Sequence, residues 1–192
     1  SDNYFTQLGR ILATSDEDSI VASKILSREN PKVIFSCGAY FNKYTGKKTV
    51  IGNGQLDGEE FMKTLSVDWC GGMGTFFPAD LIKRIGYFDQ ISFPQYDGDT
   101  DYFLRAKNDG FTTRSYPGLL IFNNTDNTGK KIDYSFANYL WWMTDVKSFM
   151  NINTRFRLYA KHTVIPISII YLFLKYLKFS ILYFLKTIRL IF

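Results

Sequence analysis

The apolar positions follow two spacings along the chain, which predict alternating helices and strands. Residues 3–12 place four apolar side chains at helical spacing after a capping Asn or Asp. Residues 33–37 and 49–51 are short apolar runs bounded by turn residues, which is typical of strands. Residues 20–26 fit either a helix or a strand.

Glycine and proline punctuate the middle of the chain. The apolar run 67–77 contains three glycines within one predicted strand. They indicate either a bulge or tight strand packing, or a close approach by a ligand or another backbone. Residues 78–86 form a predicted short helix between a proline and a glycine. A second helix is predicted over 102–109, followed by strands over 111–116 and 119–122. Helices and strands that alternate in this way predict an α/β fold.

The composition adds a strong charge asymmetry. Residues 1–145 hold 15 Lys and Arg against 18 Asp and Glu, a net charge of −3. Residues 146–192 hold 8 Lys and Arg and no acidic residue, a net charge of +8. The chain has one histidine and two cysteines, which excludes a multi-histidine metal site and a disulfide framework.

Three aspartates precede the predicted helix 102–109, and an arginine lies one turn into it. Asp97, Asp99 and Asp101 can all be solvated or capping carboxylates, because the helix dipole stabilises negative charge there. The alternative is that one caps the helix, one pairs with Arg105, and one projects into a cleft as a general base or metal ligand. Spacing alone leaves both interpretations open.

The order of these motifs is more specific than any one of them. Asp-Trp-Cys-Gly-Gly-Met-Gly at 68–74 is followed by Pro78, by Gly-Tyr-Phe-Asp at 86–89, and by the aspartate cluster. This arrangement resembles the second half of family 2 glycosyltransferases of the GT-A fold, including the rhamnosyltransferase-like enzymes of bacterial surface polysaccharide synthesis. The resemblance covers about residues 2–124 and is strongest over 68–110.

The resemblance implies a nucleotide-diphospho-sugar donor and a divalent metal, Mg or Mn, that bridges its phosphates. In the family an Asp-x-Asp motif holds the metal, and Asp2 occupies the place where that motif would end. Asp2 is also a candidate helix cap. We expect the donor-binding half to precede Ser1, so that the metal binds only with that half present.

The resemblance also implies a general base. By position that base is Asp99. Asp101 and Arg105 match an Asp and an Arg that follow it in the family, and they are candidate substrate-binding residues. Gly98 stands where many relatives have Glu. A base is needed because a sugar hydroxyl is a poor nucleophile until its proton is accepted. Direct attack by the acceptor would invert the anomeric centre.

The glycine run supplies candidate substrate-binding residues. Gly71 and Gly72 would let a substrate approach the backbone closely, and Trp69 is a candidate platform for a sugar ring or a core aromatic residue. The chain lacks the Gln/Arg-x-x-Arg-Trp motif of processive synthases.

The last thirty residues combine an apolar surface with a basic stripe. Lys175, Lys178, Lys186 and Arg189 fall within about 80° of one another around a helix. This pattern is typical of a helix that lies in the plane of an anionic membrane surface. Packing against the catalytic domain, oligomerisation or a tilted spanning helix are the alternatives. Nucleic acid binding would need a denser basic surface.

We therefore expect three segments: the acceptor-side part of a GT-A-like domain over 1–131, a helical connector over 132–162 and a membrane-associating helix over 163–192. The expected protein is an inverting glycosyltransferase, peripheral on the cytoplasmic face of the bacterial membrane, acting on a lipid-linked or growing glycan. The competing hypothesis is a non-catalytic membrane-surface or glycan-binding module.

Overall fold

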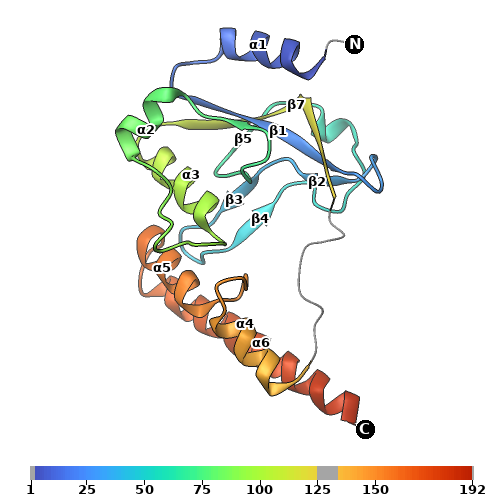
Figure 1. Cartoon of the computed structure of the whole chain (residues 1–192), viewed down its shortest axis with the longest axis vertical. Coiled ribbons are helices and arrows are strands. Elements are labelled where there is room, and N and C mark those ends of the chain that lie inside the picture. Colours follow the sequence, from blue (N-terminus) through green and yellow to red (C-terminus); the bar gives the residue numbers. More distant parts are fainter. Residues whose placement is uncertain (1–2, 125–133, 192) are drawn as a thin grey trace. The chain divides into compact units, whose positions relative to one another are not determined.

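The computed structural model describes residues 3–124 and 134–191, with side chains up to residue 188 (Figure 1). The chain divides into two compact units. The first comprises residues up to Phe41, Lys48–Phe88 and the segment from Asp99 to the end of the sheet. The second comprises Asn42–Lys47, Asp89–Gly98 and the C-terminal helices. The predicted boundary at residue 131 lies outside the described residues.

The first unit is an α/β fold. Its strands are β1 (Ser19–Ser27), β2 (Ile34–Ser36), β3 (Ala39–Phe41), β4 (Lys48–Val50), β5 (Leu65–Val67), β6 (Thr75–Phe76) and β7 (Thr112–Asn123). Its helices are α1 (Tyr4–Thr14), the 3-10 turn η1 (Glu59–Phe61), α2 (Ala79–Ile85) and α3 (Gly98–Asn108), of which Gly98 belongs to the second unit. The ambiguous run 20–26 is a strand because it lies at the centre of the sheet.

The sheet is mixed. Its order is β2-β1-β7-β5, with β6 also pairing with β1. Strands β1 and β7 run parallel, and β2, β5 and β6 pair antiparallel with their neighbours. Strands β3 and β4 form a separate antiparallel hairpin in which Phe41 pairs with Lys48.

Helices cover both faces of this sheet (Figure 1). On β1, Ile20 and Ala22 pack towards α2 and α3, where they meet Leu81 and Phe103. Val21 points to the opposite face, towards α1. This alternation is the two-residue period of a strand. Strand β1 is largely apolar because both of its faces are buried, and its one buried ammonium group, on Lys24, pairs with Asp57 at 2.7 Å.

Three predicted elements differ from the structure. The glycine run is not one strand, because β5 ends at Val67 and the backbone runs as a loop to β6. The predicted helix 102–109 begins earlier, at Gly98, which brings Asp99 and Asp101 into its first turn. The two strands predicted around Pro117 are the single strand β7, whose pairing with β1 shifts register between Tyr116 and Leu120.

The second unit is helical. It contains α4 (Phe136–Thr144), α5 (Ile152–His162) and α6 (Ile167–Ile191). Helices α4 and α5 lie within the expected helical connector 132–162. Helix α4 ends at Thr144, and α5 begins after Asn151, whose side chain accepts the amide N–H of Thr154 at 2.9 Å and so caps the helix. An aromatic and aliphatic core joins the three helices, with Trp142, Tyr159 and Tyr183 among its buried members.

Candidate active site

Asp99 stands in the first turn of α3, beside the glycine loop. The backbone N–H of Gly72 donates to its Oδ2 atom at 3.2 Å. Burial raises the pKa of Asp99, while this hydrogen bond and the positive charge of Lys48 act in the opposite direction. The carboxylate is therefore a stronger proton acceptor than an exposed aspartate, which suits a general base.

The glycines of the loop differ in what surrounds them. A Cβ atom on Gly74 would lie 2.0 Å from Ile121 Cδ1, and its φ is +61°. Gly74 is therefore required for close packing against β7, one of the two outcomes that its sequence context predicts. Gly71 has nothing within 4 Å of such a Cβ, and Gly72 has only Asp99 Oδ1, at 3.7 Å. The surface at Gly71 and Gly72, next to the carboxylate, is open.

Trp69 and Lys48 also belong to this part of the first unit, and we call Asp99, Gly72, Trp69 and Lys48 the Asp99 cluster. The Trp69 ring is half-buried against the core of the first unit, and the Lys48 Nζ atom lies 5.0 Å from its centroid. Lys48 Nζ also donates to Thr100 Oγ1 at 3.3 Å. Trp69 thus packs against the core, one of its two predicted roles, and contacts an ammonium group; its role as a platform for a sugar ring stays a prediction.

Asp101 and Arg105, the candidate substrate-binding residues of α3, form an ion pair with each other. Asp101 is fully buried, and its carboxylate accepts a hydrogen bond from Arg105 Nε at 2.9 Å. The other guanidinium nitrogens donate to the carbonyl oxygens of Ile85 and Tyr87. These bonds tie α3 to the end of α2, so the pair holds in place the helix that carries Asp99.

Asp97, the remaining aspartate of the sequence motif, belongs to the second unit. Asp97 adopts a left-handed backbone with φ of 68°, and its buried carboxylate lies 3.0 Å from Arg155 Nη1. Two nitrogens of Arg155 also donate to the carbonyl of Phe149. This ion pair joins the segment 89–98 to α5.

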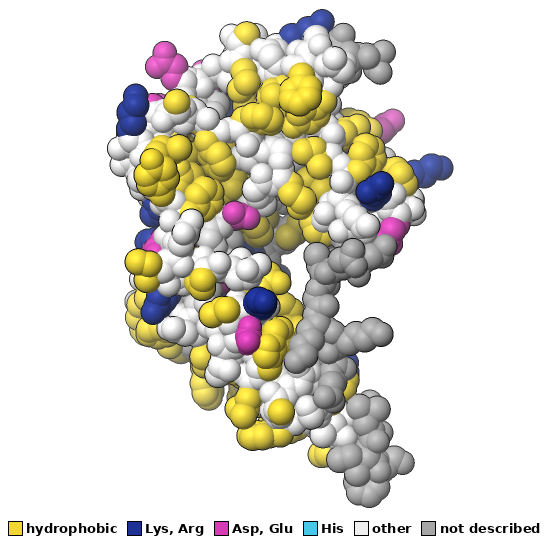
Figure 2. Space-filling model, viewed as in Figure 1, with side chains coloured by type: hydrophobic (Ala, Val, Ile, Leu, Met, Phe, Trp, Pro, Cys, Tyr) yellow, Lys and Arg dark blue, Asp and Glu magenta, His cyan; other side chains and the backbone are white. Residues whose placement is uncertain are grey.

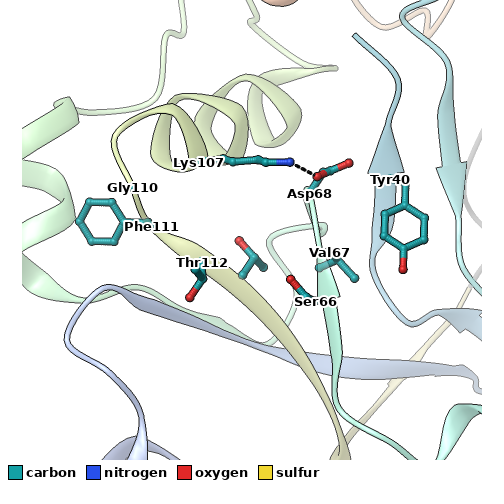
Figure 3. A pocket seen from close by; sticks show the side chains of 9 residues that line it. Tyr40, Ser66, Val67, Asp68, Lys107, Gly110, Phe111 and Thr112 are labelled. Atoms are coloured by element: carbon teal, nitrogen blue, oxygen red, sulfur yellow. Dashed lines mark hydrogen bonds and ion pairs between the residues drawn. The ribbon is translucent and has the colours of Figure 1, made fainter.

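A cavity of about 410 Å³ lies at the edge of the sheet, where β5 and β7 meet the end of α3 (Figure 3). Lys107 extends from α3 towards Asp68, and these two side chains form an ion pair. Asp68 also accepts the backbone N–H of Phe41 at 2.7 Å. Tyr40 and Thr112 line the same cavity. Through these two contacts the Asp68 carboxylate connects β3 with α3 along the wall of the cavity.

Two predicted site residues lie outside the described parts of the chain. Asp2, the metal candidate, is one, and the side chain of Arg189 is the other. In the part of the chain that the structure describes, no three carboxylate, thiol or imidazole groups are placed to hold a metal ion.

Helix α6 has three differently occupied sides. Leu172, Tyr176 and Tyr183 are buried against the neighbouring helices. An exposed apolar row lies about 140° around the helix from them; it contains Ile170, Leu177, Ile181 and Ile188. Further exposed apolar side chains extend from this row to the lysines of the helix, among them Leu174, Leu182 and Leu185. The exposed Lys175, Lys178 and Lys186 lie on the third side, where Lys186 Nζ donates to the Tyr134 hydroxyl at 3.2 Å. The surface of the second unit is accordingly rich in apolar side chains (Figure 2).

The segment Ile167–Ile188 is long and apolar enough to cross a membrane, judged by length and composition, with a mean hydropathy of 1.6. The longest uncharged run in this part of the chain, 163–174, is by itself shorter than the about 18 residues that a spanning helix needs, so the charged residues after it would have to enter the membrane as well. By length and composition, the helix is compatible with association with a membrane.

No protein-family model matches the chain, and a search of curated proteins finds no significant match. The resemblance to family 2 glycosyltransferases therefore rests on the motifs of the sequence alone.

Lys48 is the residue of this cluster that sequence reasoning missed. It lies in a polar hairpin without a recognisable motif, and its partner Thr100 is 52 residues away. The neighbouring glycines and Trp69 were found because their residue types are unusual in an apolar run.

Proposed function

We propose that this protein is an inverting glycosyltransferase of the family 2, GT-A type. It transfers a sugar from a nucleotide-diphospho-sugar to a glycan or lipid-linked acceptor in bacterial surface polysaccharide synthesis. The observation that carries the proposal is the Asp99 carboxylate, whose pKa is raised by burial, beside the open surface of Gly71 and Gly72. The mixed α/β sheet is compatible with the proposed fold family.

The proposed reaction assigns one proton transfer to Asp99. The acceptor hydroxyl forms a bond to the anomeric carbon as the bond from that carbon to the diphosphate oxygen breaks. The hydroxyl proton passes to the Asp99 carboxylate, and the electron pair of the broken bond leaves with the nucleoside diphosphate. Attack opposite the leaving group inverts the anomeric centre. A positioned base of this kind contributes about 10²–10⁴-fold to the rate.

The resemblance implies a divalent metal at the donor phosphates, which would neutralise the charge of the leaving group. Asp2 is the residue of this chain that would bind it. The roles proposed for Asp99, Gly71 and Gly72 concern the acceptor side.

We place the enzyme at the cytoplasmic surface of the membrane, with α6 lying in the membrane plane. The exposed apolar row of α6 would enter the acyl boundary, and its three exposed lysines would meet anionic headgroups. The in-plane orientation is favoured because α4, which packs along α6, has 9 residues and cannot span a bilayer with it. A membrane-bound acceptor would thereby be concentrated near the enzyme.

The class of reaction is tested with the full-length protein, which is incubated with Mn²⁺, a membrane extract and one nucleotide-diphospho-sugar at a time from a panel of donors. We expect release of nucleoside diphosphate and labelling of a lipid-soluble product with at least one donor. Binding of glycans or vesicles without nucleoside diphosphate release from any donor would contradict the proposal and support a non-catalytic module.

A further inference from the structure

Lys48 is held at the Asp99 cluster by contacts from two directions. It is the first residue of β4, opposite Phe41 in the β3–β4 hairpin. The ammonium group lies over the Trp69 ring, a contact that attracts a cation electrostatically. The same group donates to the hydroxyl of Thr100, which follows Asp99 in the first turn of α3 and is 1% exposed.

The other charged side chains near Asp99 on these elements are paired with one another. On α3 itself, Asp101 and Arg105 pair with each other. In the segment beside it, Asp68 pairs with Lys107, and Gly72 contributes its backbone N–H. The positive charge of Lys48 opposes the effect of burial on the pKa of Asp99.

Burial makes the Asp99 carboxylate more basic, but it also lowers the fraction of Asp99 that is ionised, because desolvation disfavours the charged form of a carboxyl group. A general base must be ionised before the acceptor binds. One hydrogen bond and one nearby ammonium group favour that form here.

We propose that Lys48 is a positioning residue for Asp99: held by Trp69 and Thr100, it keeps the carboxylate ionised beside the open surface of Gly71 and Gly72. Trp69 accordingly serves as the platform for Lys48. This inference rests on the proposed function for its meaning, but its test needs no substrate.

The test follows the backbone amide of Gly72 by ¹H–¹⁵N NMR while the pH is varied, since this amide donates to Asp99 and reports its ionisation. Lys48→Met removes the charge, and we expect the midpoint of the Gly72 transition to move to higher pH. Lys48→Arg should keep it near the wild-type position. Lys47→Met, at the exposed neighbouring residue, is the matched control and should not shift it. Asp99→Asn should abolish the transition and so assign it.

An unchanged midpoint in folded Lys48→Met would overturn the inference. If that variant does not fold, Lys48→Gln replaces it, because Gln lacks the charge but can still donate to Thr100. A shift caused by Lys47→Met as large as that caused by Lys48→Met would also overturn it. A shifted midpoint in a protein that releases no nucleoside diphosphate would support the Lys48–Asp99 coupling and contradict the proposed reaction.

Discussion

Two glycines three residues apart have different roles, and substitution separates them. Gly74 has a positive φ and no space for a Cβ atom beside Ile121, whereas Gly71 has open space. Gly74→Ala should lower the free energy of unfolding by about 1–3 kcal/mol, through overpacking and backbone strain. Gly71→Ala should change it by less than about 1 kcal/mol. Urea unfolding of both variants checks the difference, and equal losses would contradict the assigned roles.

The raised pKa of Asp99 also predicts a pH-dependent stability. The folded state binds the Asp99 proton more tightly than the unfolded state, so the contribution of Asp99 to stability is present at low pH. It is lost as the pH rises through the folded pKa. Asp99→Asn should therefore raise the free energy of unfolding relative to wild type at pH 7, but not at about pH 3, where the carboxyl is protonated in both states.

Urea unfolding at the two pH values measures this difference. Glu60→Gln, at an exposed carboxylate, is the control and should have little effect at either pH. An Asp99→Asn effect of the same size at both pH values would show that charge is not its cause.

At the scale of elements, an ion pair joins the segment 89–98 to α5. Removing Arg155 leaves the Asp97 carboxylate buried without its cation. Arg155→Ala should therefore lower the free energy of unfolding by about 3–5 kcal/mol. Arg157→Ala, two residues along the same helix, removes a single hydrogen bond to the Ile91 carbonyl and should cost about 1 kcal/mol.

Chemical unfolding followed by the aromatic signals of this unit makes the comparison. Adding Asp97→Asn to Arg155→Ala should recover part of the lost stability, because it removes the uncompensated charge. Equal effects of Arg155→Ala and Arg157→Ala would contradict the importance of the pair.

The elements that the sequence predicted well are those determined locally. Helix α1 begins after Asn3, whose side chain accepts the N–H of Thr6, and Gly86 ends α2, as their residue types predict. The early start of α3 at Gly98 was missed, because nothing local distinguishes an aspartate before a helix from one in its first turn. The sequence marks the candidate site in two ways, at Gly71 by the glycine run and at Asp99 by the motif that carries the family resemblance. Lys48 is not marked, because its role depends on a contact with Thr100 that only the folded chain creates.

At the scale of the whole molecule, part of the positive charge of the C-terminal segment lies on the exposed surface of α6. Lys175, Lys178 and Lys186 each contribute about 1 kcal/mol near an anionic membrane. Replacing all three with Gln should therefore weaken binding to vesicles that contain anionic lipid by roughly 100-fold. Replacing the exposed Lys32, Lys63 and Lys83 of the first unit changes the net charge equally and should have a smaller effect.

Vesicle flotation measures this binding for the two triple variants. Release of the wild-type protein by high salt or alkaline carbonate would support a helix in the membrane plane. Retention under both conditions would indicate that α6 spans the bilayer, and binding unaffected by the α6 substitutions would contradict the electrostatic contribution.

The central claim is that Asp99 accepts the proton of the acceptor hydroxyl. The most direct measurement is the rate of sugar transfer by wild type and Asp99→Asn, with Glu60→Gln as the matched control and donor binding measured in parallel. We predict that Asp99→Asn lowers the rate by about 10²–10⁴-fold and leaves donor binding unchanged. Transfer by Asp99→Asn at close to the wild-type rate would contradict the claim.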